Sequence, residues 1–228
     1  MTTSANRRAE MRRKQTQHQG EASRSMLWWI VGGVLLAVIL SAVVAIATNK
    51  DDEVVEIPAN YEQNRPVAVS GTSLPGIPQG GGPDPALGMT APIVTGQSFD
   101  GSPVTTAGNG PRMIVVVAHW CPHCRNEVPR LVQWQQSGQM PAGLDVVFVS
   151  TSVQSNAPNY PPSRWLEDVE HVTWPTLADD VAQTAAAALG TSGFPYFLVV
   201  DANGTVVLRD SGEQDTASLT ARIEAALG

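Results

Sequence analysis

Hydrophobic and polar positions divide the chain into three parts. Residues 27–48 (LWWIVGGVLLAVILSAVVAIAT) contain no charged side chain, whereas residues 49–85 are polar and rich in Pro and Gly. From about residue 86, short β-branched runs and longer mixed stretches alternate with turn-forming residues. Such alternation is typical of a globular domain that combines strands and helices.

The apolar runs of the globular part predict buried strands, and the mixed stretches between them predict helices. We expect four strands at residues 113–118, 144–150, 196–200 and 205–208, and four helices at residues 122–137, 163–170, 178–189 and 218–227. A turn at residues 99–101 precedes a further short strand near Val104, and Asn203-Gly204 favours a hairpin between the last two strands. The order of these elements predicts the α/β fold class, with a mixed sheet and helices on both faces.

The apolar run at residues 27–48 is long enough to cross a membrane. Its twenty-two residues would span about 33 Å as a helix, and a hydrocarbon core is about 30 Å thick. Trp28 and Trp29 lie near its start, where interfacial aromatic side chains anchor membrane helices. Six basic side chains precede it within residues 1–26, and three acidic ones follow at 51–53. The positive-inside rule therefore places residues 1–26 in the cytoplasm and the bulk of the chain outside.

A cleaved signal peptide is the alternative for this run, because Ala45-Ile46-Ala47 resembles a small-residue cleavage site. The run is longer than the apolar core of ordinary signal peptides, about 7–15 residues, which favours a retained transmembrane helix. The Pro and Gly residues that follow predict a flexible linker without a core of its own. The expected organisation is a cytoplasmic basic tail at 1–26, a transmembrane helix at 27–48, a flexible linker at 49–85 and a globular domain at 86–228.

Composition and charge narrow the function classes. Hydrophobic residues make up 43% of the chain and charged residues 15%, which excludes a wholly disordered chain and a polytopic membrane protein. The net charge is −7, and residues 49–228 alone hold eight basic and nineteen acidic side chains. An acidic folded part argues against nucleic acid as a partner.

The candidate chemistry lies at the two cysteines of the chain, Cys121 and Cys124, which follow a predicted strand and open a predicted helix. A cysteine at a helix N-terminus faces unpaired backbone N–H groups and the positive end of the helix dipole, so we expect the pKa of Cys121 to be lowered. Cys124 lies one turn later, within reach to close a disulfide. His123 would favour the Cys121 anion further and bias the pair toward oxidising behaviour. The pair is therefore predicted to be a redox-active dithiol.

A pair of cysteines also serves in metal sites and in c-type haem attachment. A metal site would have to add His119 and His123, but adjacent residues rarely reach one tetrahedral centre, and no second cysteine pair exists. Haem attachment needs a histidine directly after the second cysteine, where this chain has Arg125. We therefore expect neither a metal nor a dissociable cofactor, because the electrons reside on the cysteine pair.

The sequence around the cysteines resembles the thioredoxin superfamily over residues 86–228. The segments that carry the resemblance are MIVVVAHWCPHC, CRNEVPRL and GFPYFLVVDANGTVV. Glu127 resembles an acidic residue of the membrane-anchored TlpA/ResA-like branch, and the predicted anchor and linker are also similar to those of that branch. The CPHC sequence instead resembles that of DsbA-like oxidants. The resemblance implies a thioredoxin-like mixed sheet with flanking helices. It also implies a cis peptide bond at Pro195, in a loop that faces the dithiol.

This resemblance implies roles for the residues around the dithiol. Cys121 attacks a substrate disulfide, Cys124 resolves the mixed disulfide, and Pro195 belongs to the catalytic machinery together with His123 and Glu127. The backbone at Phe194 is expected to pair with an extended substrate beside Cys121, with Trp120 and Pro195 as further substrate contacts.

Glu127 and His119 each have two interpretations. Glu127 is either a solvated helix residue or a partly buried carboxylate that manages the proton of Cys124, and the resemblance favours the second. His119 is either a surface residue at the end of a strand or an electrostatic modulator of the dithiol.

The sequence thus predicts a single-pass, membrane-anchored thiol-disulfide oxidoreductase in a bacterial-type plasma membrane, with its catalytic domain in an oxidising extracytoplasmic space. Its expected substrates are protein thiols and disulfides of secreted or membrane proteins. Its expected redox partner is a quinone-linked oxidase, as the DsbA resemblance implies, or a transmembrane electron conduit, as the TlpA/ResA resemblance implies. The alternatives are a reductase dedicated to cytochrome c maturation and a non-catalytic binding module of the same fold.

Overall fold

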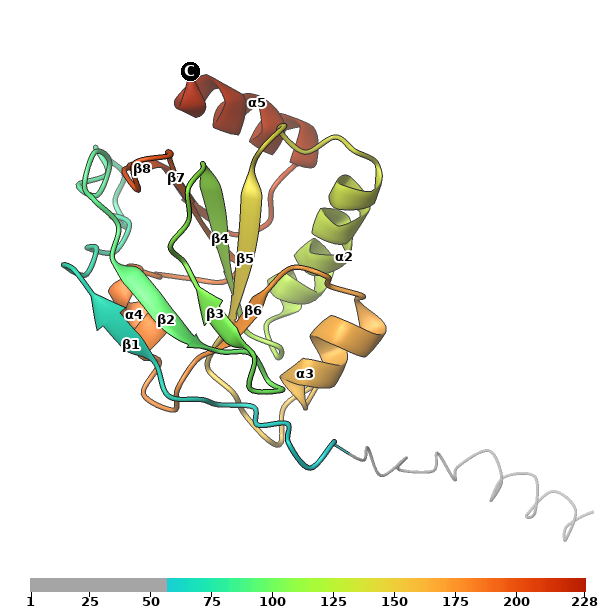
Figure 1. Cartoon of the computed structure of the whole chain (residues 1–228). Helices are drawn as coiled ribbons and strands as arrows, with labels where there is room; N and C mark the ends of the chain where they lie inside the picture. The colour runs from blue at the N-terminus through green and yellow to red at the C-terminus, as the bar shows by residue number, and fades with distance from the viewer. Residues whose placement is uncertain (1–56) are drawn as a thin grey trace, which may run out of the picture. The chain divides into compact units, whose positions relative to one another are not determined.

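Two β-sheets organise residues 57–228, the part of the chain that the computed structural model describes (Figure 1). The larger sheet has five strands in the order β6-β5-β4-β7-β8. Parallel pairs join β4 to β5 and β5 to β6, and antiparallel pairs join β4 to β7 and β7 to β8. The strands are β4 (Arg112–Val117), β5 (Asp145–Ser150), β6 (Thr176–Ala178), β7 (Tyr196–Val200) and β8 (Val206–Ser211). The predicted mixed sheet is confirmed.

Alternating side chains of the central strand β4 enter two separate hydrophobic cores. Met113, Val115 and Val117 point to one face of the sheet, and Ile114 and Val116 to the other. All six residues of β4 are buried, which explains why its sequence is continuously apolar after Arg112 rather than alternating.

Helices cover both faces of this sheet, as predicted (Figure 1). The first core packs α2 (Pro122–Gln136), the π-helix η1 (Trp165–Val169) and α5 (Thr216–Leu227) against the sheet. The second core packs α4 (Thr184–Ala188) and a small second sheet against the opposite face. Asp215 caps α5, because its carboxylate accepts a hydrogen bond from the backbone N–H of Ser218 at 2.9 Å.

The second sheet has three antiparallel strands, β1 (Ala68–Ser70), β2 (Ile93–Gln97) and β3 (Pro103–Thr105). Val94 and Val104 bury their side chains in the second core. The turn predicted at residues 99–101 joins β2 to β3, and Gly101 has a φ of +92° there, which glycine adopts without steric cost. The strand near Val104 is confirmed, whereas β1 and β2 were not predicted.

Residues 57–85 belong to the folded unit, so the prediction of a flexible linker is wrong for this segment. The Leu74 side chain is buried, and its N–H donates to the carbonyl of Ala188 at 2.9 Å. Asp84 forms an ion pair with Arg209 of β8, whose side chain is fully buried. These few anchor points lie in a segment without apolar periodicity, which explains why the sequence pattern did not indicate them. The predicted tail, transmembrane helix and linker residues 49–56 lie outside the described residues.

Two predicted helices differ from the structure. The helix expected at 163–170 is one turn of α-helix, α3 (Pro162–Arg164), that continues directly as η1. The segment expected to be one helix at 178–189 instead contains the last residue of strand β6, then an irregular stretch, and only then the short helix α4. Asp179 causes this break, because its buried carboxylate accepts hydrogen bonds from the N–H groups of Ala185 and Ala186 and from the hydroxyl of Thr151.

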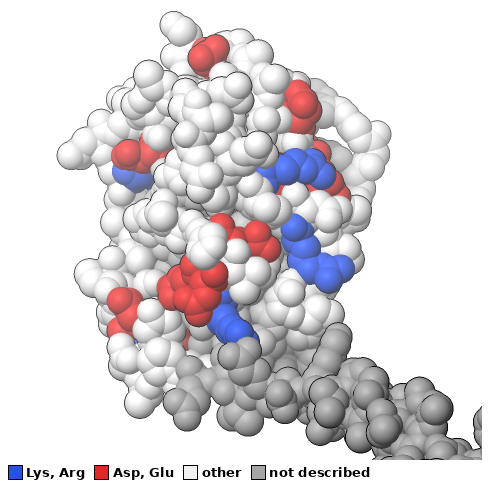
Figure 2. All heavy atoms as spheres, turned by 90° about the vertical axis from the view of Figure 1, so that its right-hand side faces the viewer, with Lys and Arg blue, Asp and Glu red and all other residues white. Residues whose placement is uncertain are grey.

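The charged surface and the helix lengths bear on the predicted partners. On one face of residues 57–228, Arg side chains lie beside Asp and Glu side chains and are separated by uncharged surface (Figure 2). That face therefore offers no broad basic area. Within the described part of the chain, no helix is long and apolar enough to cross a membrane.

Candidate functional site

Cys121 is the N-cap residue of α2, directly after the turn that follows β4. Its N–H donates to the carbonyl of Ala118 at 3.0 Å, and Pro122 occupies the first helical turn, where its missing N–H is not needed. The Cys121 residue is 6% exposed, whereas Cys124, one turn further, is 0% exposed. Both are free thiols in the structure. The two cysteines thus share one helix turn, and only Cys121 retains a small exposed fraction.

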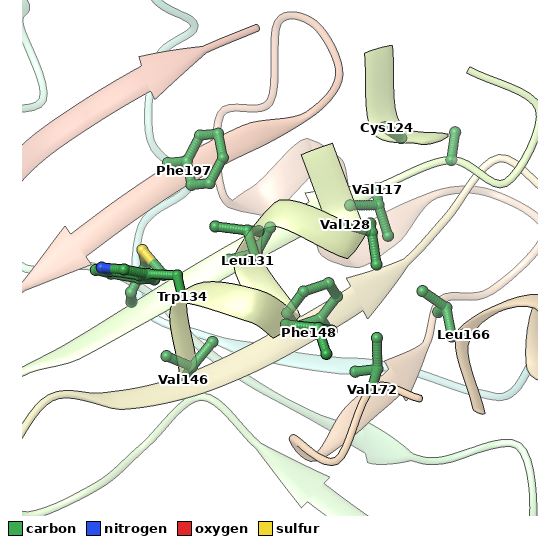
Figure 3. Close-up of a cluster of buried hydrophobic side chains, with 14 of the residues drawn as sticks. Val117, Cys124, Val128, Leu131, Trp134, Val146, Phe148, Leu166, Val172 and Phe197 are labelled. Atoms are coloured by element: carbon green, nitrogen blue, oxygen red, sulfur yellow. The ribbon is translucent and has the colours of Figure 1, made fainter. Parts of the chain in front are cut away.

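Cys124 lies at the edge of the first hydrophobic core, near Val117 and Val128 (Figure 3). Burial raises the pKa of the Cys124 thiol well above its usual range, and the neighbouring Cys121 and Glu127 raise it further. The Cys124 thiol therefore remains protonated at neutral pH unless a base accepts its proton.

Glu127 is a fully buried carboxylate one turn after Cys124, so the interpretation as a solvated helix residue is wrong. Burial raises its pKa to about 7, against the opposing effects of the Gln214 N–H and the Arg130 guanidinium. These groups contact Oε2 of Glu127, at 3.2 Å and 3.4 Å. The other oxygen, Oε1, has no hydrogen-bond partner in the structure. Glu127 can therefore gain or lose a proton near neutral pH, beside the buried thiol.

The loop before β7 faces the dithiol. The Phe194–Pro195 peptide bond is cis, as the sequence resemblance implied. The carbonyl oxygen of Phe194 lies 3.6 Å from Sγ of Cys121, and the Phe194 ring contacts Trp120 edge-on with centroids 6.1 Å apart. The structure thus places the three predicted substrate contacts, Trp120, Phe194 and Pro195, together beside the attacking sulfur.

His119 is fully buried, so the interpretation as a surface residue is wrong. Its Nδ1 lies 2.7 Å from the carbonyl of Pro158, and its Nε2 lies 3.1 Å from the backbone N–H of Gln154. A carbonyl accepts and an N–H donates, so the ring is neutral with its hydrogen on Nδ1. Burial also lowers the pKa of His119. The ring fastens the loop at residues 152–160 beside the dithiol.

His123 contacts Glu213, a residue that the sequence did not indicate. Its side chain is 66% exposed, and its Nδ1 lies 2.8 Å from Oε1 of Glu213. Asn126 and Arg130 also donate to the Glu213 carboxylate, and the three hydrogen bonds lower its pKa to about 2. Glu213 is 90 residues from His123 in sequence, and only the path of β8 to α5 brings them together. No local pattern indicated this contact.

The described residues contain no group of three or more His, Cys, Asp or Glu side chains that could hold a metal ion. The predicted site residues instead gather around the two sulfurs.

Comparisons with known proteins point to one family. A model of the Redoxin family matches residues 86–227. No curated protein matches the chain.

Solved structures show the same fold. A thiol:disulfide interchange protein of the thioredoxin family from Chlorobium tepidum TLS is 26% identical, with a TM-score of 0.50, and the match covers 61% of this chain and 96% of that one. A provisionally named thiol:disulfide interchange protein DsbE from Chlorobium tepidum is 23% identical, with a TM-score of 0.52 and coverage of 62% and 98%. A provisionally named thioredoxin from Neisseria meningitidis is 20% identical, with a TM-score of 0.50 and coverage of 60% and 89%.

Proposed function

The chain belongs to the Redoxin family of thioredoxin-fold oxidoreductases, and from this premise we propose that it is a membrane-anchored, extracytoplasmic protein thiol-disulfide oxidoreductase. The observation that carries the proposal is the position of Cys121. Its sulfur sits at a helix N-terminus, 3.6 Å from the Phe194 carbonyl, with the Cys124 thiol buried one turn below. The name of the 26% identical protein from Chlorobium tepidum supports the same chemistry.

Cys121 is the sulfur that exchanges with the substrate, because it alone of the two has exposed surface. In the reducing direction its thiolate attacks one sulfur of a substrate disulfide. This step forms a mixed disulfide and releases the other substrate sulfur as a thiolate. The unpaired N–H groups at the start of α2 stabilise negative charge on the attacking sulfur.

Cys124 completes the reaction with Glu127. The Cys124 thiol passes its proton to the Glu127 carboxylate and attacks Sγ of Cys121. The Cys121–Cys124 disulfide then forms and the second substrate sulfur leaves as a thiolate, so the substrate gains two electrons and the enzyme loses two. In the oxidising direction the same steps run in reverse, and protonated Glu127 returns the proton to the Cys124 thiolate.

Substrate contacts are proposed for Trp120, Phe194 and Pro195. Trp120 is held in place by a hydrogen bond from its Nε1 to the carbonyl of Ser152 at 2.7 Å, and it supports the Phe194 ring. An extended substrate segment would lie along this loop with its sulfur at Cys121, paired with backbone groups beside Phe194.

Membrane attachment is supported by the sequence of residues 27–48 and by the basic residues that precede it. We expect the full chain to sediment with plasma membranes in alkaline carbonate and residues 57–228 to be cleaved by protease added outside the cytoplasm. Its redox partner would then be a membrane protein that supplies or removes electron pairs.

The direction of electron flow depends on the reduction potential of the Cys121–Cys124 pair, measured in glutathione or dithiothreitol buffers. A value near about −270 mV favours a reductase, such as one for apocytochrome c, and a value near about −120 mV favours an oxidase.

We predict that Cys124→Ser traps substrate proteins on Cys121 as mixed disulfides, because the resolving thiol is absent. Non-reducing electrophoresis of the full chain from intact membranes would detect adducts that dithiothreitol removes. The double variant Cys121→Ser/Cys124→Ser is the matched control and should form none. Adducts that require Cys124 instead would reverse the two roles.

A non-catalytic binding module is the competing function. Insulin-disulfide reduction with dithiothreitol as electron donor separates the two. The oxidoreductase should accelerate insulin precipitation, and Cys121→Ser should abolish the acceleration. If insulin precipitates at the uncatalysed rate with both the wild-type protein and Cys121→Ser, the protein is a binding module and not an oxidoreductase.

A further inference from the structure

Glu213 lies in the loop between β8 and α5. It and the buried Glu127 both contact the side chain of Arg130. Nη2 of Arg130 donates to Oε2 of Glu213, and Nη1 of the same guanidinium reaches Oε2 of Glu127 only at 3.4 Å. The next residue in the loop, Gln214, donates its N–H to Glu127 at 3.2 Å. Arg130 is therefore shared by two carboxylates, and its closer contact is with Glu213.

The two carboxylates differ in their surroundings. The Glu127 side chain is 0% exposed, whereas the Glu213 side chain is 25% exposed and also accepts hydrogen bonds from His123 and Asn126. With these partners Glu213 holds the arginine at the surface. A guanidinium that turned fully to a buried carboxylate would stabilise its charged form and weaken it as a base.

We propose that Glu213 is a positioning residue that withholds the Arg130 cation from Glu127, and so keeps Glu127 able to exchange a proton with Cys124 near neutral pH. The inference deepens the proposed function and rests on it. It gives a role to a carboxylate that lies 83 residues from Arg130 in sequence and does not touch the sulfurs in the structure.

The groups that face Glu127 agree with this role. Arg130 and Cys124 face it from α2, and Glu213 and Gln214 face it from the loop before α5. The charge of Glu213 also repels a charge on Glu127 directly, which raises the pKa of Glu127 in addition to the effect of burial. The pKa of Glu213 itself is about 2, so this residue stays charged throughout the range in which Glu127 titrates.

The test follows the proton transfer in a single turnover with 5,5′-dithiobis(2-nitrobenzoate) and the reduced full chain in detergent. Cys121 attacks the reagent, which forms a mixed disulfide and releases one thionitrobenzoate. Cys124 then loses its proton and attacks Cys121, which releases a second thionitrobenzoate and closes the disulfide. The pH dependence of the second release reports on the base that accepts the Cys124 proton.

In the wild-type protein, the rate of the second release should decrease as the pH falls through about 7, where Glu127 becomes protonated. In Glu213→Gln, the inflection should move to lower pH by about one unit, because Arg130 then pairs with Glu127 alone. Adding Arg130→Met to Glu213→Gln should reverse the shift, since the cation is gone. Asp210→Asn, which removes a carboxylate paired with Arg222 instead, is the matched control and should leave the inflection unchanged.

The outcomes separate this inference from the proposed function. An inflection that stays in place in Glu213→Gln, while Glu127→Gln removes it, overturns the role of Glu213 and leaves the oxidoreductase intact. An inflection that Glu127→Gln leaves unchanged overturns the inference as well, because Glu127 is then not the base. Release of only one thionitrobenzoate per wild-type chain instead contradicts the dithiol mechanism itself.

Discussion

At the scale of single residues, Glu127 combines a stability cost with the proton-acceptor role that we propose for it. Its side chain is fully buried, Oε1 lacks a partner, and its pKa is raised to about 7 from an ordinary value of 4.5. A folded state that disfavours a charge loses stability whenever the pH forces that charge on it. A structural carboxylate would gain nothing from this arrangement, whereas a proton acceptor for Cys124 needs it.

We predict that Glu127→Gln stabilises the protein above pH 7 and not below pH 4.5. The folded wild-type protein binds more protons than the unfolded chain between these values, so its stability falls as the pH rises through this window, and the variant escapes the loss. The gain at pH 8 should be about 1–2 kcal/mol, after allowance for solvent screening, or about 3 °C in Tm. Thermal unfolding at pH 4.5 and pH 8 measures it.

Glu224→Gln makes the same chemical change at an exposed position of α5 and serves as the control. An equal response of Tm to pH in Glu127→Gln and in the wild-type protein would contradict the assigned titration.

Residues close in sequence to the dithiol could be predicted, and residues brought there by topology could not. Cys121, Cys124 and Glu127 lie within two helix turns, and Pro195 precedes a recognisable pair of strands. Glu213 follows the last strand and carries no sequence pattern of its own. Its position depends on the antiparallel return of β8 beside β7, which a single sequence does not specify at the level of side chains.

At the scale of elements, the His119-Trp120 dipeptide fixes the loop at residues 152–160. Both ring nitrogens of His119 and the indole Nε1 of Trp120 bind backbone groups of this loop, and Asn159 returns a hydrogen bond to the carbonyl of His119 at 2.9 Å. The loop therefore forms a fixed side to the region around Cys121.

We predict that His119→Ala destabilises the protein by about 1–3 kcal/mol, because it leaves the carbonyl of Pro158 and the N–H of Gln154 without their partner. Amide hydrogen exchange at Gln154 should become faster. Since the pKa of His119 is lowered from 6.5, the wild-type protein should lose stability below about pH 6.5, a loss that the variant lacks.

His171→Asn changes an exposed histidine at a positive φ, which asparagine tolerates, and should leave the exchange at Gln154 unchanged. Wild-type exchange rates at Gln154 in His119→Ala would show that other contacts hold the loop.

Strong apolar runs made the central strands predictable, and short or sparsely apolar segments were missed. The continuous runs of β4, β5 and β7 were predicted to within one residue at each end. The three residues of β6 adjoin an alanine-rich stretch, so the combined segment was predicted to be one helix. Strand β1 pairs with β2 through backbone hydrogen bonds while most of its surface stays exposed, and such a strand leaves no alternating pattern.

At the scale of the whole molecule, the folded unit begins at residue 57, whereas the match to the Redoxin family begins only at residue 86. Residues 57–85 are therefore an addition to the part that matches the family. Two residues of this segment contact the buried Arg209 of β8. Asp84 pairs with this guanidinium, and the carbonyl of Pro75 and the hydroxyl of Tyr196 accept from it at 2.6 Å and 3.3 Å. The segment is therefore attached to β8, the strand that leads to Glu213.

We predict that Asp84→Ala costs about 3–5 kcal/mol, because it leaves the charge of Arg209 buried without its anion. Chemical denaturation at pH 7 measures the loss. The pKa of Asp84 is held below its ordinary 3.8 by Arg209, so the wild-type advantage should be present above pH 3.8 and disappear as the pH falls through the folded pKa.

The matched control is Asp210→Asn, which removes the partly exposed partner of Arg222 and should cost less than about 1 kcal/mol. Equal costs in the two variants would contradict a special role for the buried pair.

The difference in exposure between the two cysteines also has a consequence for the order of events in the proposed reaction. Each thiol-disulfide exchange with another protein has to take place at Cys121, which is 6% exposed, because Cys124 is fully buried. Under the proposed function, a client protein and a membrane redox partner would therefore compete for one atom and bind in turn. Steady-state kinetics with both should give the parallel double-reciprocal lines of a ping-pong scheme, and an excess of either should inhibit turnover of the other.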